Sequence, residues 1–162
     1  MPKKTLAVFL ALHLTAFYPQ QVPTFNGKVV AVLDGDTIEV MRSGKAVRLR
    51  LNGIDAPEKS QAFGNASKKF TSDRLFDKVV KVLSTGTDRY GRTLADIYVG
   101  RDWFNYESVA HGYAWHFKKY SDNSELADAE ALARSARLGL WEDKSPTPPW
   151  EYRKSKKNEE SE

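Results

Sequence analysis

The sequence contains no cysteine and only three histidines. Without thiols, the protein can have no disulfides, thiolate nucleophiles, zinc–thiolate sites or lipid-modified cysteine. The histidines are His13, His111 and His116, and the last two show no serine and acid arranged as in a hydrolase triad. A metal ion would therefore be bound by oxygen ligands, which favours Ca²⁺ or Mg²⁺ over zinc.

The apolar run near the N-terminus is too short for a comfortable membrane span. Two lysines precede this run, Leu6–Tyr18, and Pro19 ends it. This pattern favours a secretory signal peptide in residues 1–19, with a poorly defined cleavage site near Ala16. A buried N-terminal helix or strand and an uncleaved membrane anchor are the alternatives. We expect the protein to be secreted or periplasmic, with no stable membrane insertion after cleavage.

The remaining composition is that of one globular domain. The chain has 162 residues, of which 41% are hydrophobic and 28% are charged. The formal net charge of +4 falls to +2 without residues 1–16, which carry two lysines and no acid. Such a mild charge permits nucleic acid as a partner without requiring it. We expect one domain over residues 20–153 and a solvated, charged tail over 154–162.

The hydrophobic pattern predicts five short strands and about three helices. The strands are expected at Lys28–Leu33, Thr37–Met41, Ala46–Ile54, Val79–Leu83 and Thr93–Val99. The helices are expected at Ala66–Phe76, Trp103–His111 and across residues 124–141. A helix inserted among five strands suits an α+β protein built on a Greek-key barrel of the OB type.

Four acids lie where strands end. The stretch "LDGDT" places Asp34 and Asp36 around a glycine, which is typical of a tight hairpin turn. Asp55 and Glu58 follow the third predicted strand in "DAPE". If these strands are neighbours, the carboxylates converge at one end of the barrel and repel one another unless a cation lies between them.

Arginines accompany these acids. Arg50 lies on the polar face of the third predicted strand, and "DRYGR" supplies Arg89, Tyr90 and Arg92. Guanidinium groups suit phosphate oxygens, and a tyrosine can stack on a base. The alternative for "DRYGR" is a solvent-facing loop. Acids that hold a metal beside arginines that hold a phosphate indicate phosphodiester hydrolysis.

Three segments together, "LDGDTIEV", "RLNGIDAPE" and "DRYGRTLADIY", resemble the staphylococcal (micrococcal) nuclease family in order and spacing. The similarity extends from about Gly27 to Trp141. It implies an OB-fold, Ca²⁺-dependent nuclease that cuts DNA and RNA with little sequence preference and leaves 3′-phosphate ends. The alternative is a catalytically silent OB-fold module that binds nucleic acid or protein. The intact set of acids and arginines favours the enzyme.

The resemblance also implies roles for individual residues. Asp36, Asp55 and the backbone carbonyl of Ala56 match the metal ligands, and Asp34 matches an acid that supports them. Glu58 matches the residue that positions or deprotonates the attacking water.

The same motifs imply the contacts to substrate. Arg50 and Arg92 match the phosphate-binding arginines, Arg92 also assisting the leaving oxygen, while Arg89 and Tyr90 lie where the nucleotide binds. Lys118 or Tyr120 is a weaker candidate for substrate contact. We expect a monomer without an obligate protein partner. The tryptophans are expected to pack in the core, at Trp103, Trp115 and Trp141, or to staple the C-terminus onto the domain, at Trp150.

Overall fold

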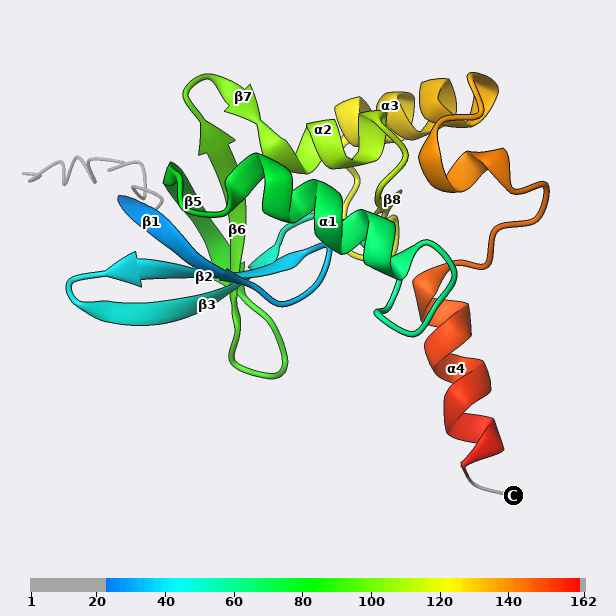
Figure 1. Cartoon of the computed structure of the whole chain (residues 1–162), viewed down its shortest axis with the longest axis horizontal. Coiled ribbons are helices and arrows are strands. Elements are labelled where there is room, and N and C mark those ends of the chain that lie inside the picture. Colours follow the sequence, from blue (N-terminus) through cyan, green and yellow to red (C-terminus); the bar gives the residue numbers. More distant parts are fainter. Residues whose placement is uncertain (1–22, 161–162) are drawn as a thin grey trace, which may run out of the picture.

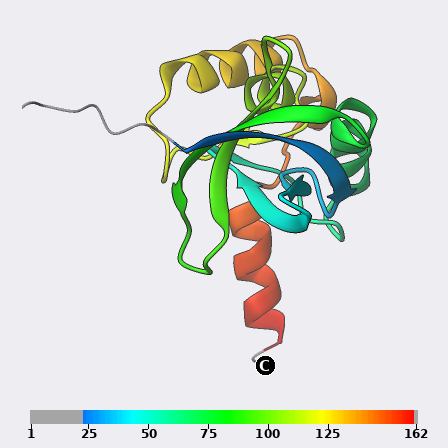
Figure 2. The same ribbon diagram turned by 90° about the vertical axis from the view of Figure 1, so that its left-hand side faces the viewer.

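The computed structural model describes residues 23–160, so the expected signal peptide lies outside the described residues. Five strands form a closed barrel (Figures 1 and 2), namely β1 Thr24–Val32, β2 Thr37–Arg42, β3 Lys45–Leu51, β5 Val79–Thr87 and β6 Thr93–Val99. Their order is β3-β2-β1-β5-β6, and a parallel pairing of β3 with β6 closes the barrel. The predicted OB-type fold is therefore confirmed, and a short strand β7, Asp102–Trp103, extends the sheet beyond β6.

Alternation of apolar residues explains how the barrel is filled. Along β3, Leu49 and Leu51 are buried while Arg48 is exposed, as the pattern predicts. The core continues through fully buried side chains on every barrel strand, including Val29, Ile38 and Ile97. Burial of this apolar surface is the main favourable contribution to folding.

The third predicted strand was expected to run to Ile54, and this is wrong. β3 ends at Leu51, and a turn containing Gly53 separates it from the two-residue strand β4, Ile54–Asp55. Gly53 has φ = +74°, a conformation that interrupts a regular strand. β4 then pairs with β8, Trp115–His116, instead of continuing the barrel.

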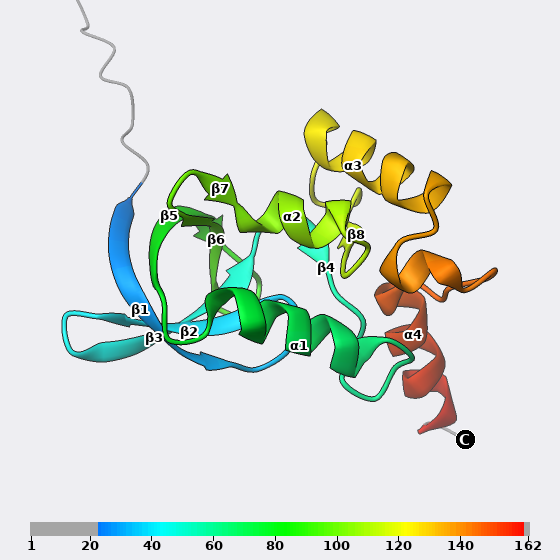
Figure 3. The same ribbon diagram turned by 45° about the horizontal axis from the view of Figure 1, so that its top comes forward.

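Four α-helices occur in the described residues, where about three were expected (Figure 3). They are α1 Gly64–Leu75, α2 Phe104–Ala110, α3 Ser124–Ser135 and α4 Pro149–Glu159. Asn123 caps α3, its Oδ1 accepting a hydrogen bond from the Leu126 backbone N–H. The helix predicted across residues 124–141 is interrupted, since α3 ends at Ser135 and a 3₁₀ turn follows at Gly139–Glu142.

The helix α4 was not predicted, because "PTPPW" suggested only a break in secondary structure. Pro149 is instead the first helical residue, a position where its missing N–H costs nothing. The expected solvated tail continues this helix to Glu159, with exposed side chains beyond Tyr152. α4 projects away from the barrel, and only its first turns lie against the body of the protein (Figure 2).

A tryptophan attaches α4 to the domain, as expected. The ring of Trp150 stacks on Phe117 with centroids 5.4 Å apart and meets Trp115 edge-on at 5.5 Å. Trp115 and Trp141 are buried in a second apolar cluster, while Trp103 packs half-buried against the barrel core. Over residues 23–160, no helix is both apolar and long enough to span a bilayer.

We expect Trp150→Ala to lower the free energy of unfolding by about 2 kcal/mol, less than a fully buried aromatic because Trp150 is half-buried. Urea denaturation followed by circular dichroism would measure this. The control is Leu132→Ala on α3, whose side chain is 68% exposed. Equal stability of the two variants would contradict the assigned anchoring role.

Candidate active site

The "LDGDT" stretch forms the turn between β1 and β2 and also carries acids into a buried site. The backbone N–H of Leu33 donates to the Thr37 carbonyl, which closes the turn. Gly35 is required by close packing, because a Cβ there would overlap Ser67 Oγ and lie 2.7 Å from Ala56 Cβ. This stretch is therefore both a hairpin turn and part of an acidic site, so the two interpretations are compatible.

Asp36 is 5% exposed and fully surrounded by donors. Its Oδ2 accepts a hydrogen bond from the Ala56 N–H at 2.6 Å and forms an ion pair with Arg50 Nη2 at 2.9 Å, while Oδ1 accepts from the Thr37 hydroxyl at 3.1 Å. Burial raises the pKa of Asp36 to about 8, although Arg50 acts in the opposite direction. A further cation at this carboxylate would favour its ionised form.

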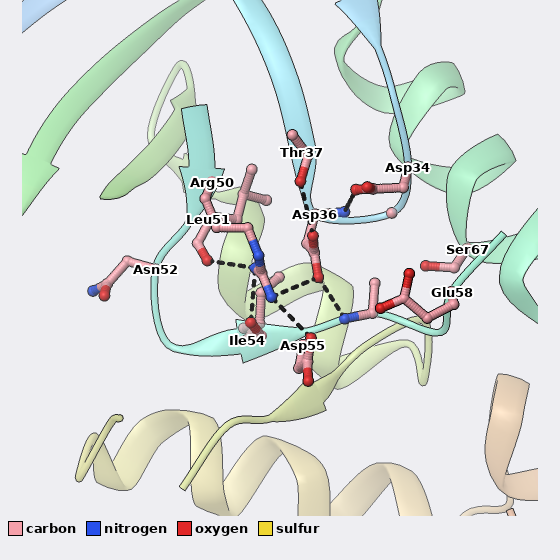
Figure 4. A network of polar contacts seen from close by, with 12 residues as sticks. Asp34, Asp36, Thr37, Arg50, Leu51, Asn52, Ile54, Asp55, Glu58 and Ser67 are labelled. Atoms are coloured by element: carbon pink, nitrogen blue, oxygen red, sulfur yellow. Dashed lines mark hydrogen bonds and ion pairs between the residues drawn. The ribbon is translucent and has the colours of Figure 1, made fainter. Parts of the chain in front are cut away.

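Arg50 joins two acids through one guanidinium nitrogen (Figure 4). Its Nη2 lies 2.9 Å from Asp36 Oδ2 and 2.9 Å from Asp55 Oδ1. Its Nη1 donates to the backbone carbonyls of Leu51 and Ile54, both at 2.9 Å. Since both carbonyls belong to the turn between β3 and β4, the guanidinium is held in one orientation by the backbone itself.

Asp55 is positioned by the small β4–β8 sheet. It pairs with Trp115, sixty residues further along the chain, and is 1% exposed. A charge so deeply buried is costly unless it is paired and hydrogen-bonded. Both of its carboxylate oxygens accept hydrogen bonds from guanidinium groups.

Glu58 stands beside these acids at the solvent boundary. Its backbone N–H donates to Gln61 Oε1, and the Gln61 amide donates to the Thr147 carbonyl at 2.6 Å. Gly64 at the start of α1 packs so closely on the Glu58 carbonyl that any Cβ would overlap it. The Glu58 side chain remains 37% exposed, so it can meet water or substrate.

A second guanidinium at this site belongs to Arg153 of α4, which sequence reasoning missed. Arg153 Nη2 lies 2.8 Å from Asp55 Oδ2, and Nη1 lies 2.7 Å from Glu58 Oε1 and 3.2 Å from Asp55 Oδ1. Partial burial lowers the pKa of Arg153, but the hydrogen bonds to Asp55 and Glu58 outweigh this and raise it. No local signal distinguishes Arg153 from its charged neighbours in the sequence.

The "DRYGR" residues lie in the β5–β6 hairpin and do not join this network. Arg92 Nε forms an ion pair with Asp88 at 2.7 Å. The guanidinium of Arg89 lies 4.7 Å from the ring centroid of Tyr90, and that ring is 69% exposed. β6 pairs with β3 so that Thr93, the residue after Arg92, lies beside Leu49. The β6 side of the hairpin turn is therefore next to the strand that carries Arg50.

The remaining candidates have structural partners. Lys118 forms an ion pair with the buried Glu130 at 2.8 Å, and Tyr120 is 63% exposed. His116 Nε2 lies 3.1 Å from Ser121 Oγ, but Glu130 accepts from the His116 backbone N–H and not from its ring. This arrangement is not that of a hydrolase triad. Substrate contact by Lys118 or Tyr120 stays a prediction.

Within residues 23–160, no three acids, histidines or cysteines converge closely enough to hold a metal ion as the side chains stand. Guanidinium groups occupy the space between the acids, Arg50 between Asp36 and Asp55, and Arg153 between Asp55 and Glu58. Each guanidinium marks a position that favours a cation. The carboxylates of Asp36 and Asp55 and the backbone carbonyl of Ala56 offer only oxygen atoms as ligands. Such a donor set fits Ca²⁺.

Comparison with known proteins agrees with this geometry. A family model described as "Staphylococcal nuclease homologue" matches residues 48–143. An uncharacterized endonuclease of Haemophilus influenzae is 43% identical, covering 96% of this chain and 88% of the relative. A micrococcal nuclease of Shigella flexneri is 36% identical, covering 96% of this chain and 98% of the relative. With its OB-type barrel and its buried acids around Arg50, the chain belongs to the staphylococcal nuclease family.

Proposed function

We propose that the protein is an exported, Ca²⁺-dependent endonuclease that hydrolyses DNA and RNA with little sequence preference and leaves 3′-phosphate ends. The observation that carries this proposal is the pairing of Asp36 and Asp55 through Arg50, with Glu58 beside them at the surface. Similarity to relatives named as nucleases supports the reaction class. Export rests on the N-terminal residues 1–19 alone.

Asp36, Asp55 and the backbone carbonyl of Ala56 are the residues that would hold Ca²⁺. The donor set is consistent with this, since four acids at the site, counting Asp34 and Glu58, face only two arginines. Such an excess of negative charge favours a divalent cation. When bound, the ion supplies Lewis-acid polarisation of the phosphoryl group.

The chain's own residues then act on the phosphodiester. Arg50 donates to phosphate oxygens from an orientation fixed by two backbone carbonyls, so little reorganisation is needed as charge develops there. Glu58 orients a water molecule and accepts its proton as the water oxygen bonds to phosphorus. The bond from phosphorus to the 5′ oxygen breaks, and that oxygen takes up a proton, which leaves a 3′-phosphate and a 5′-hydroxyl.

The β5–β6 hairpin supplies the outer contacts. Arg92 is paired with Asp88 and is 34% exposed, so a phosphate can compete for its guanidinium. The exposed ring of Tyr90 offers a face for a base or ribose, and Arg89 lies over the same ring. These contacts would be made to the phosphate backbone of the nucleic acid and to the face of a base or ribose. Because neither contact reads the edge of a base, both are consistent with weak sequence preference.

Digestion of single-stranded DNA, double-stranded DNA and RNA by the chain from residue 20 onward tests the proposal. We expect cleavage with Ca²⁺ and none after chelation. DNA products should resist extension by a polymerase until a phosphatase removes their 3′-phosphate. Products that extend without phosphatase treatment would contradict the assigned bond cleavage. Binding without cleavage would favour a silent nucleic-acid-binding module.

The variant Glu58→Gln tests the proton acceptor. We expect it to fold and bind Ca²⁺ but to lose about 10²–10⁴-fold in kcat, because the amide cannot accept the proton of water. The control is Glu151→Gln, because Glu151 of α4 is an exposed acid that has no part in the network of Asp36, Asp55 and Glu58. Near-normal kcat for Glu58→Gln would refute its role, and loss of its circular dichroism spectrum would identify Glu58 as structural.

The variant Arg92→Lys tests the phosphate contact of the hairpin. A lysine keeps the charge but cannot form a two-pronged hydrogen bond, so we expect a loss on the order of 10²–10³-fold in kcat/KM. Arg48→Lys is the matched control, because Arg48 is also an arginine paired with an acid, Glu39, on the barrel surface. Equal activity of the two variants would remove Arg92 from the reaction.

A further inference from the structure

The C-terminal helix α4 contributes to the active site although it lies outside the barrel. Trp150 packs on Phe117 and Trp115, and the Tyr152 hydroxyl donates to the Ser60 carbonyl at 3.1 Å. These contacts fix the first turns of α4 against β8, the residue that follows β8 and the loop after β4. Arg153 is thereby held over Asp55 and Glu58.

The two arginines of the site are held in different ways. Arg50 is 11% exposed and donates to two backbone carbonyls as well as to the acids. Arg153 is 43% exposed, and within the described residues its only hydrogen-bond and ion-pair partners are Asp55 and Glu58. Arg153 can therefore leave the carboxylates by a side-chain movement alone, whereas Arg50 would have to break backbone hydrogen bonds.

Arg153 occupies the oxygens that a metal ion needs. It donates to both oxygens of Asp55, and the Oδ1 of Asp55 is shared with Arg50. Neither oxygen of Asp55 is available to a divalent ion while Arg153 remains. Without Arg153, Asp55 would keep only Arg50, which it shares with Asp36, so its burial favours an incoming cation.

We propose that Arg153 is a positioning residue of the active site, which holds Asp55 and Glu58 in the metal-free protein and is exchanged for Ca²⁺ when the ion binds. This inference rests on the Ca²⁺ site of the proposed function. Arg153 also lines an open cavity, together with Glu58, Ser60, Tyr152, Lys156, Lys157 and Glu160. Binding of the ion therefore releases the charge of Arg153 from Asp55 and Glu58 into this cavity, which suits a phosphate backbone.

Calorimetric titration with Ca²⁺ alone tests the exchange in the wild-type chain, Arg153→Gln and Lys154→Gln. Lys154 is the matched control, because it is the next residue on α4, is exposed, and its side chain has no hydrogen bond or ion pair in the described residues. Both variants lose one positive charge, but only Arg153→Gln removes the competitor. We expect Ca²⁺ to bind Arg153→Gln on the order of tenfold more tightly, with little change for Lys154→Gln.

Thermal unfolding provides a readout that does not depend on activity. In chelator, Arg153→Gln should melt below the wild type because Asp55 has lost a partner. In saturating Ca²⁺ the two should melt together, because the ion replaces the guanidinium in both. Arg153→Lys should give an intermediate Ca²⁺ affinity, since a single ammonium cannot contact both carboxylates as the guanidinium fork does.

Two results separate this inference from the proposed function. Unchanged or weaker Ca²⁺ binding by Arg153→Gln, or an equal gain in Lys154→Gln, would overturn the exchange while leaving the Ca²⁺ site intact. Absence of Ca²⁺ binding in the wild type and in Arg153→Gln alike would overturn both the exchange and the proposed Ca²⁺ dependence.

Discussion

The structure of the site depends on one guanidinium shared by two buried carboxylates. Arg50 Nη2 lies 2.9 Å from Asp36 and from Asp55, and both acids are nearly inaccessible to solvent. Two buried like charges would repel strongly, and each alone would carry a large desolvation cost. Because backbone carbonyls of the β3–β4 turn hold Arg50, the turn, the acids and the barrel strands that carry them stabilise one another.

Topology explains why these groups meet. Asp36 directly precedes β2, and β2 pairs with β3 so that Thr37 lies opposite Arg50. Asp55 comes from β4, whose only pairing in the described residues is with β8 in a separate sheet. The barrel thus places one acid and the arginine, while a contact between distant segments places the other acid.

The sequence predicted the parts of the site that are set by local spacing. The acids of "DGDT" and "DAPE" and the alternation that places Arg50 on the face of β3 opposite Leu49 and Leu51 are encoded within single strands and turns, so their convergence could be expected. Arg153 could not be predicted, because its position depends on Trp150 packing against Phe117 and on a helix that begins at a proline. The break at Gly53 was missed because the strand was extended to the apolar Ile54, although Asn52–Gly53 interrupts the alternation of Val47, Leu49 and Leu51.

A nuclease site of this kind must reconcile opposite electrostatic demands. In the proposed function it needs enough negative charge to bind a divalent cation, yet its substrate is a polyanion. The side chain of Arg50 is held by backbone carbonyls, whereas Arg153 lies on an exposed helix, and this difference meets both demands. Arg50 keeps the buried acids together in the metal-free protein, while the exposed Arg153 balances Asp55 and Glu58 until, in the proposed exchange, an ion does so. In the proposed exchange, the charge of Arg153 is released toward the cavity that it lines with Lys156 and Lys157, so binding of the metal would also prepare the site for the substrate.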